Sequence, residues 1–429
     1  MSGPVTSAGS QWSRLHPLTP LLRGGRFLFA VLAVVGQQGL RSASVPVLLL
    51  GLLAVLPVGL AVGVVAWRTT RYRLTATELQ VDSGVLRKRS RRVPLARLQS
   101  VDIVRSLAAR TFGLAELRLE VAGGGKTEAP LAYLSEGDAH HVRTRLLARA
   151  SGAPDAGVDA PEAVLVAVPL GALIGSALLG VPAILAGLLL IALAVAAAVA
   201  PGTLPALLAG VLPLLLATGG VVVRKLLVEY GFTVAESPDG LRLRHGLLDT
   251  RAQTIPYGRV QTVRVREPLL WRRLHWVRVE VDVAGYTATR GEEQATTRAL
   301  LPVAPREFAL RLVDRVLGAA LPPLGQLPPR SARLRAPRSA RRLRWGLDDR
   351  HLVTTRGAFT TTTDIVPLAR VQSLRLTQGP WQRRLGLASV HADSAGRRLP
   401  GAVAHHRSQA EAEALLGELT GRARRARRR

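Results

Sequence analysis

The residues best suited to chemistry belong to a nine-residue motif that occurs three times in the chain. Its pattern is apolar-Pro-x-x-Arg-apolar-Gln-Ser/Thr-apolar, and the copies begin at Val93, Ile255 and Val366. The arginine of each copy, with the glutamine beside it, is suited to meet a phosphate group, because a guanidinium group donates strong hydrogen bonds to anionic oxygens. The candidate ligand or lipid contacts are therefore Arg97, Gln99, Arg259, Gln261, Arg370 and Gln372.

A structural role explains the same motif. In this interpretation the proline starts a strand at a sheet edge, the apolar pair packs inward, and the glutamine satisfies backbone groups in a bend. We favour the structural role, because a motif kept through three diverging copies is expected to serve the fold that they share.

The other polar clusters in the sequence do not match a known catalytic or metal site. His140-His141 and His405-His406 stand near the starts of equivalent predicted helices, where adjacent side chains do not share a face, so we expect solvated histidines. Residues 123–126 lack the spacing of a phosphate-binding loop, and Asp348-Asp349 is expected to lie in a turn. The absence of cysteine excludes disulfides and thiolate catalysis. We therefore predict no enzyme activity, no cofactor and no metal.

The charge pattern indicates anionic partners. The chain has 429 residues and a formal net charge of +29, yet 48% of its residues are hydrophobic. Long uncharged stretches alternate with arginine-dense stretches, so we expect the lipid bilayer and its anionic head groups to be partners, with a protein partner or a second copy of the chain. Nucleic acid is not expected, because no stacking aromatic residues are interleaved with the basic runs.

The uncharged stretches form two membrane segments. Residues 1–67 form an N-terminal segment with two predicted transmembrane helices, at 27–40 and 44–67. Residues 151–225 form a linker and a second segment, whose uncharged run 163–223 is long enough for two or three spans. We choose two spans, with 163–179 oblique or partly interfacial.

The basic flanks predict the orientation of these spans. Arg68, Arg71 and Arg73 follow the first segment, whereas Arg41 alone marks its other side, so the N-terminus and residue 68 onward are expected in the cytoplasm. The domains on either side of the second segment are copies with basic flanks. Both should therefore lie on one side of the membrane, which requires an even number of crossings.

Three β-rich domains occupy the rest of the chain, at residues 68–150, 226–320 and 344–420. Apolar and polar residues alternate between Val277 and Val283, which is typical of a strand with one buried face. Each domain then ends in a helix, and Ser135-x-x-Asp138 and Ser408-x-x-Glu411 have the form of a capping box. A Pro/Arg-rich linker at 321–343 precedes the third domain, and a basic tail at 421–429 ends the chain.

The copies share a register beyond the opening motif. Nineteen residues after Pro94 and Pro367 come Gly113 and Gly386, each within an Arg-x-x-Gly-Leu-Ala sequence. His275 occupies this position in the second copy. In the third copy, residues 389–393 have few apolar side chains for a half-buried strand.

The repeated Leu-Gln-Ser and Val-Gln-Thr cores, the Arg-x-x-Gly-Leu-Ala sequences and the N-terminal Arg14-Leu-His-Pro-Leu resemble the bacterial pleckstrin-homology-like (PH-like) domains of YdbS/YdbT-type membrane proteins. The order of spans and domains is also similar to that of these proteins. The resemblance implies a bent antiparallel sheet capped by a C-terminal helix, and no catalytic residues. His275 departs from the family pattern, which has glycine there.

The predicted fold class is an α-helical membrane protein plus α+β, with transmembrane helices and three PH-like domains. The predicted function is a non-enzymatic, multi-pass protein of the cell membrane that presents these domains in the cytoplasm to protein, peptide or anionic lipid. Roles in envelope stress or antimicrobial resistance are implied by the resemblance alone. The alternative is a transporter or transport accessory subunit that uses residues 163–223, which the absence of ionisable residues from the spans disfavours.

Overall fold

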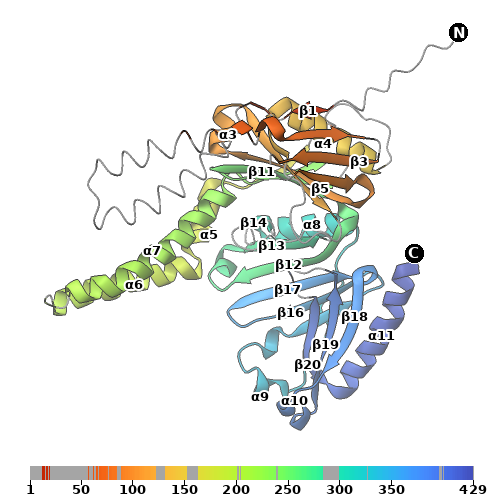
Figure 1. The fold of residues 1–429 in the computed structure, drawn as a ribbon. Coiled ribbons are helices and arrows are strands. Elements are labelled where there is room, and N and C mark those ends of the chain that lie inside the picture. Colours follow the sequence, from red (N-terminus) through yellow and green to blue (C-terminus); the bar gives the residue numbers. More distant parts are fainter. Residues whose placement is uncertain are drawn as a thin grey trace. The chain divides into compact units, whose positions relative to one another are not determined.

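A computed structural model of the chain forms two compact units (Figure 1). Unit 1 comprises Met1–Asp159 and Leu248–Gln253, and unit 2 comprises Ala160–Leu247 and Thr254–Arg429. The structure describes residues 12–14, 16, 17, 19, 57, 61, 64, 65, 67–75, 77–84, 88–121, 131–151, 163–200, 202, 204–237, 240–283, 299–325, 327–395, 399 and 401–428. The two predicted spans at 27–40 and 44–67 lie almost wholly outside the described residues.

The first copy of the repeat folds as three strands, a 3-10 turn, three strands and a helix. Its elements are β2 (Arg71–Leu74), β3 (Glu78–Ser83), β4 (Arg89–Pro94), η1 (Leu95–Arg97), β5 (Leu98–Ser106), α3 (Leu107–Thr111), β6 (Leu114–Val121), β7 (Leu131–Ser135) and α4 (Glu136–Ser151). All neighbouring strand pairs are antiparallel, as the alternating pattern predicts.

The second and third copies repeat this order. The second contains β9 (Thr233–Ser237), β10 (Gly240–His245), β11 (Asp249–Ile255), η3 (Tyr257–Arg259), β12 (Val260–Pro268), η4 (Trp271–Leu274), β13 (Trp276–Val283), β14 (Ala299–Pro305) and α8 (Arg306–Leu317). The third contains β15 (Arg344–Leu347), β16 (His351–Arg356), β17 (Thr360–Pro367), η6 (Leu368–Arg370), β18 (Val371–Thr377), α10 (Pro380–Arg384), β19 (Leu387–Ser394), β20 (Ala402–Ser408) and α11 (Gln409–Arg428). The Pro/Arg-rich linker between them adds α9 (Ala332–Arg335) and η5 (Ala340–Arg342).

Strand β19 is complete although its sequence has few large apolar residues. Val390 and Ala392 are buried with Leu387 and Ala388, so small side chains are enough to face the core of the third copy. The helix that follows also differs from the prediction. The basic tail continues α11 to Arg428, because alanine and arginine favour helix and positive charge suits a helix C-terminus.

Two of the closing helices begin at the predicted capping boxes. The Ser135 hydroxyl accepts a hydrogen bond from the Asp138 backbone amide at 3.1 Å, and the Ser408 hydroxyl accepts one from the Glu411 amide at 3.2 Å. Each bond satisfies a backbone amide of the first turn, which has no carbonyl partner within the helix. Local sequence therefore sets the start of both helices.

The copies are joined to one another through their sheets. In unit 2, β12 of the second copy pairs with β17 of the third, which gives a six-stranded sheet in the order β14-β13-β12-β17-β16-β15 (Figure 1). In unit 1, β5 of the first copy pairs with β11, the third strand of the second copy. Val353 and Ile365 of the third copy even belong to the core of the second. The copies therefore share strand pairs and core residues and are not structurally independent of one another.

The apolar segment at 163–223 begins with a strand, which the sequence interpretation missed. β8 (Ala163–Ala167) pairs with β9, so that Ala163 faces Glu236 and Ala167 faces Thr233. The short helix α5 (Leu170–Leu178) follows. The expectation of an oblique or interfacial membrane stretch at 163–179 is therefore wrong for the strand. A short uncharged run is compatible with a membrane stretch or with a strand. Here the pairing with the edge of β9 makes it a strand.

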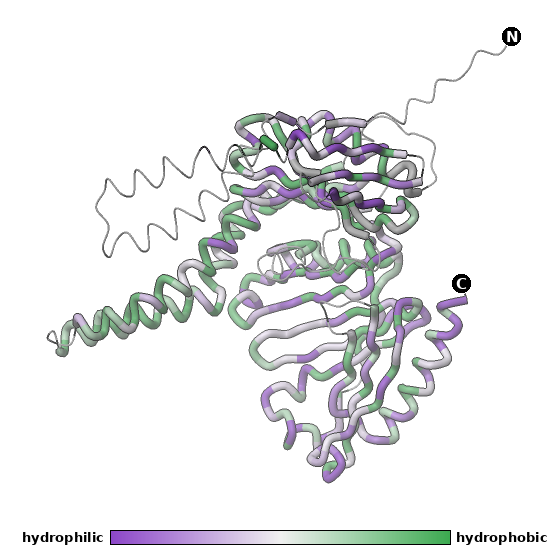
Figure 2. The backbone as a smooth tube through the Cα atoms, viewed as in Figure 1, coloured by the Kyte–Doolittle hydropathy of each residue, from purple (hydrophilic) through white to green (hydrophobic). Residues whose placement is uncertain are grey.

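Two long apolar helices follow. α6 (Val181–Val199) and α7 (Leu204–Glu229) are long and apolar enough to cross a bilayer by length and composition. No residue of α6 is buried, and Figure 2 shows hydrophobic residues along most of both helices. Such helices need an apolar environment, because exposing this much apolar surface to water is unfavourable.

The position nineteen residues after the motif proline has a left-handed backbone in every copy. The φ angle is 64° at Gly113, 51° at His275 and 64° at Gly386. His275 therefore keeps the turn that glycine makes in the other copies. A side chain with a Cβ is strained in this region, and the His275 side chain is exposed.

We expect His275→Gly to raise the free energy of unfolding by about 1 kcal/mol, because glycine adopts this backbone without the Cβ clash. Gly386→Ala should lower it by a similar amount, since the added Cβ would be strained at the left-handed φ of 64° and no neighbouring atom lies within 4 Å of it to add a packing effect. Denaturant unfolding of the chain in detergent measures both changes. A less stable His275→Gly variant would show that imidazole contacts outweigh the backbone strain.

Candidate functional site

The repeated motif forms the turn between the two halves of each copy. Pro94 and Pro367 are the last residues of β4 and β17, and Pro256 directly follows β11. The next three residues form a 3-10 turn, and the following strand begins at Leu98, Val260 or Val371. The expectation that the proline starts a strand is therefore wrong. Proline ends the preceding strand instead, where its missing N–H breaks no sheet hydrogen bond.

The candidate contact residues do not behave alike. Gln261 is 4% exposed, and its Nε2 donates to the Arg259 carbonyl at 3.4 Å, so it serves the turn itself. Arg259 and Arg370 are exposed, and Arg370 donates to the Gly258 carbonyl, which links the motif turns of the second and third copies. Gln372 is exposed. The Arg97 and Gln99 side chains lie outside the described part of the structure, so their predicted contacts stay predictions.

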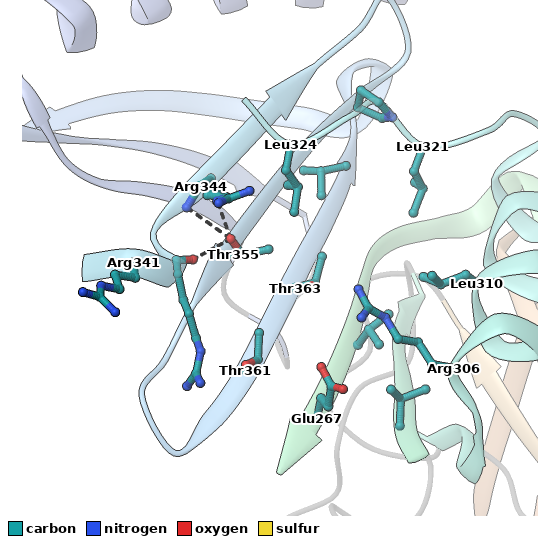
Figure 3. Close-up of a pocket in the computed structure, with 15 residues that line it drawn as sticks. Glu267, Arg306, Leu310, Leu321, Leu324, Arg341, Arg344, Thr355, Thr361 and Thr363 are labelled. Atoms are coloured by element: carbon teal, nitrogen blue, oxygen red, sulfur yellow. Dashed lines mark hydrogen bonds between the residues drawn. The ribbon is translucent and has the colours of Figure 1, made fainter. Parts of the chain in front are cut away.

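A basic pocket lies beside the sheet that joins the second and third copies (Figure 3). Its volume is about 370 Å³. Four arginines, three threonines and one acidic residue supply its polar lining, and they are Arg306, Arg341, Arg342, Arg344, Thr355, Thr361, Thr363 and Glu267. Leu310, Leu321 and Leu324 supply apolar surface. The composition suits a ligand with an anionic group and a short apolar part.

Individual pocket residues differ in their freedom to meet a ligand. Figure 3 shows Arg306, the first residue of α8, extending toward the middle of the group, whereas Arg341 points outward. Arg342 instead donates to the Ala358 carbonyl. The Thr355 hydroxyl donates to the Arg342 carbonyl at 2.6 Å. Arg306 is therefore the residue best placed to contact an anion.

A further arginine holds the hairpin between β16 and β17 at the rim of this region. Arg272 Nη2 donates to the Phe359 carbonyl at 3.1 Å and to the Thr361 hydroxyl at 2.8 Å. Burial lowers the pKa of Arg272, and the positive charge of Arg342 lowers it further. Arg272 and Arg342 therefore shape the hairpin rather than offer open sites.

The apolar helix α7 is fixed to the second copy by a buried ion pair at its C-terminal end. Glu229 Oε1 lies 2.7 Å from Arg278 Nη1, and the two side chains are 4% and 14% exposed. Burial alone would lower the pKa of Arg278, but Glu229 and Glu280 outweigh it and raise the pKa. Lys225 Nζ lies 5.4 Å from the centroid of the Trp271 ring, a cation–π contact. The helix pair therefore has a defined attachment to the sheet.

We expect Glu229→Ala to destabilise the chain by about 3–5 kcal/mol, because it leaves the Arg278 guanidinium buried without its main counterion. The control is Glu418→Ala, which breaks a 2.6 Å pair with Arg422 whose side chains are 44% and 25% exposed. Its effect should be under about 1 kcal/mol. Thermal unfolding in detergent compares the two, and equal losses would contradict the assigned role of Glu229.

The other clusters singled out in the sequence are structural where they are described. Asp348 accepts the backbone amides of Arg350 and His351 at 2.7 and 2.5 Å, which is the expected turn. His405 and His406 lie in β20 rather than at a helix start, and burial lowers the pKa of His405 to about 4, with neighbouring positive charges adding to the shift. Among the described residues, no three metal-binding side chains gather. Residues 123–126 lie outside the described part.

Comparison with known proteins decides the family. The family model of the bacterial PH domain matches three times, at residues 27–150, 165–320 and 308–423. The chain belongs to the bacterial PH domain family. The first match includes residues 27–67 and the second includes most of the apolar run at 163–223, so both apolar segments lie within matched regions of this chain.

A curated relative is also similar to part of this bacterial PH protein. It is the UPF0699 transmembrane protein YdbT of Bacillus subtilis, 30% identical over 84 residues. The match spans 19% of this chain and 17% of the relative's length. No solved structure matched the chain. Proteins with PH domains are generally non-enzymatic.

Proposed function

We propose that this bacterial PH protein is a non-enzymatic, multi-pass membrane protein that presents three PH domains at the cytoplasmic face. There the domains bind anionic lipid head groups and partner proteins. The main support is the pairing of strands that flank the apolar segments. Because such strands lie side by side in one sheet, both ends of the intervening segment must be on the same side of a membrane.

This argument applies to both segments. β8 and β9 are antiparallel neighbours, and the apolar helices α6 and α7 lie between them in sequence. β1 (Ser13–Arg14) and β2 are also antiparallel neighbours, with Ser13 facing Tyr72, and they flank the first apolar segment. An even number of crossings is required in each case, and two helices satisfy it for the second segment.

The basic residues indicate how the proposed spans are oriented in the membrane. Arg224 and Lys225 lie near the sheet end of α7, as Arg68 and Arg71 do after the first apolar segment. Positive charge is retained on the cytoplasmic side of a bacterial membrane. The sheets that carry the flanking strands are therefore assigned to the cytoplasm.

The absence of native cysteine allows a direct topology measurement. We expect Gly202→Cys, at an exposed position between α6 and α7, to react with a membrane-impermeant maleimide added to intact cells. Ser331→Cys, in the linker between the second and third copies, should react only after the membrane is opened, because it lies on the other side. Reaction of both in intact cells, or of neither until lysis, would contradict the two-span assignment.

The basic pocket beside β12 and β17 supports binding of an anionic head group. Arg306 extends into it, its threonine hydroxyls can donate hydrogen bonds to phosphate oxygens, and its leucines can meet the start of an acyl chain. The net charge of +29 would attract such head groups to the whole cytoplasmic face.

We expect the full chain in neutral detergent to bind short-chain phosphatidylglycerol more tightly than short-chain phosphatidylcholine, with affinity that falls as salt rises. Arg306→Ala should weaken phosphatidylglycerol binding about fivefold, which corresponds to about 1 kcal/mol for one charge near the head group. The control is Arg311→Ala, an exposed arginine on the same helix α8 that does not line the pocket. Isothermal titration measures both, and equal effects would remove the pocket from the proposal.

A further inference from the structure

Strand β18 presents an open hydrogen-bonding edge at a position that is covered in the other two copies. β5 lies between β6 and β11, and β12 lies between β13 and β17. Among the described residues, β18 pairs with β19 alone. An unpaired strand edge is a template for another strand, because its amide and carbonyl groups point outward in register.

The two covered edges use one register. Val265 lies nine residues after the motif proline Pro256 and faces Thr363, which lies four residues before Pro367. In unit 1, Ile103 lies nine residues after Pro94 and faces Ala252, four residues before Pro256. The repeat therefore carries a specific docking geometry, in which the strand after the motif accepts the strand that ends at another motif proline.

The side chains of the open edge are exposed where those of its counterpart are buried. Gln261 and Thr262 on β12 are 4% and 0% exposed. Their equivalents on β18, Gln372 and Ser373, are both exposed. The two strands therefore differ in the exposure of these side chains although their motifs match. The third copy has the strand that forms the junction in the other copies, but no partner strand is paired with it there among the described residues.

The charge at the centre of the junction identifies the chemistry of that partner. Arg264, eight residues after its motif proline, faces Asp364, and Nε lies 2.5 Å from the carboxylate. Asp364 is fully buried there. The equivalent residue on β18 is Arg375, whose side chain is 57% exposed. Its Nε lies 2.7 Å from a carboxylate oxygen of Asp393 on the neighbouring strand β19. A strand docked in the same register would place one residue opposite Arg375.

A second copy of this chain does not fit that position. The strand that ends at its first motif proline is β4, and the residue three before Pro94 is Arg91. Arg91 would face Arg375, and Arg92 would follow it. Like charges directly opposite one another destabilise a strand pair, and arginines along an edge strand are a common protection against such pairing.

We propose that β18 accepts an antiparallel strand from a partner protein, and that this strand carries a carboxylate opposite Arg375. The proposal rests on the proposed function, in which the PH domains serve as interaction modules at the membrane. The backbone of β18 would supply affinity, and Arg375 would select an acidic residue at one place in the strand. The three-stranded sheet β18-β19-β20 would gain a fourth strand, as the equivalent sheets of the other copies do.

The test uses the full chain in detergent and a fluorescent synthetic peptide with the sequence of residues 359–368, which carries Asp364 in the required register. We expect this peptide to bind, and its Asp364→Lys version to bind at least tenfold more weakly. Arg375→Glu in the protein should reverse that order. Arg383→Glu, which changes an exposed arginine on α10 by the same charge, should leave the order unchanged.

A disulfide experiment locates the bound peptide, since the chain has no native cysteine. A peptide with Val366→Cys should oxidise onto Ser373→Cys on β18, the position that the junction register places opposite it. It should not oxidise onto Val403→Cys on β20, an edge strand whose counterparts β7 and β14 also have a single strand neighbour. Equal trapping at both positions, or no preference between the Asp and Lys peptides, would overturn the proposal.

A third peptide, with the sequence of residues 88–95 from β4, represents the second copy of the chain. Tighter binding of this basic peptide than of the acidic one would make the occupant another copy and overturn the assignment of a partner. These outcomes are separate from those of the proposed function. Maleimide labelling of Gly202→Cys reports membrane topology whether or not any peptide binds, and peptide selectivity is measured in detergent whatever the topology.

Discussion

Backbone hydrogen bonding at the strand after each motif is the constraint on which the rest of this structure depends. The 3-10 turn at the motif divides each copy into two halves, and the strand that follows has an edge to satisfy. In the second copy β17 supplies the missing neighbour of β12, and in unit 1 β11 supplies that of β5. A cut between copies would expose such an edge and the core residues Val353 and Ile365. The three similar sequences are therefore linked through shared strand pairs.

The same constraint connects the sheets to the apolar segments. β8 precedes α6 and α7 in sequence yet lies beside β9, which follows them. The loop that contains the helices must therefore start and finish at adjacent strands. Glu229 and Arg278 then fix the C-terminal end of α7 to the second copy through a buried ion pair. Because the helices leave from one sheet and return to it, the apolar segment and most of the second copy lie in one compact unit.

The large positive charge has two different roles in the structure. Asp364, which is fully buried, lies 2.5 Å from Arg264 and 3.1 Å from Arg356, so these arginines stabilise the junction between copies. Arg407 is also fully buried, where it donates to the Leu343 carbonyl and lies 3.3 Å from Glu411. Burial lowers the pKa of Arg407, and Glu411 opposes that shift. Other arginines, with Arg306 the best placed, stay exposed and can meet anions.

The sequence by itself determined the features that depend on local pattern. Periodicity and the repeated motif identified three copies and their family, the capping boxes marked helix starts, and length with composition marked α6 and α7. Gln261 also behaves as its structural interpretation predicts, since it satisfies a carbonyl within its own turn. Such features need only residues that are close together in the chain.

Only the tertiary structure decided which edges meet. A short uncharged run such as β8 has the same composition as part of a span, and the neighbouring strand β9 alone makes it a strand. The pocket combines residues from Val265 to Thr363, and Arg264 meets Asp364 one hundred positions further on. Gln261 is buried and Gln372 is exposed although they occupy the same position of the motif, because their surroundings in the fold differ. Local sequence specifies a strand and its register, but its neighbour is set by the backbone edge that the fold leaves open beside it.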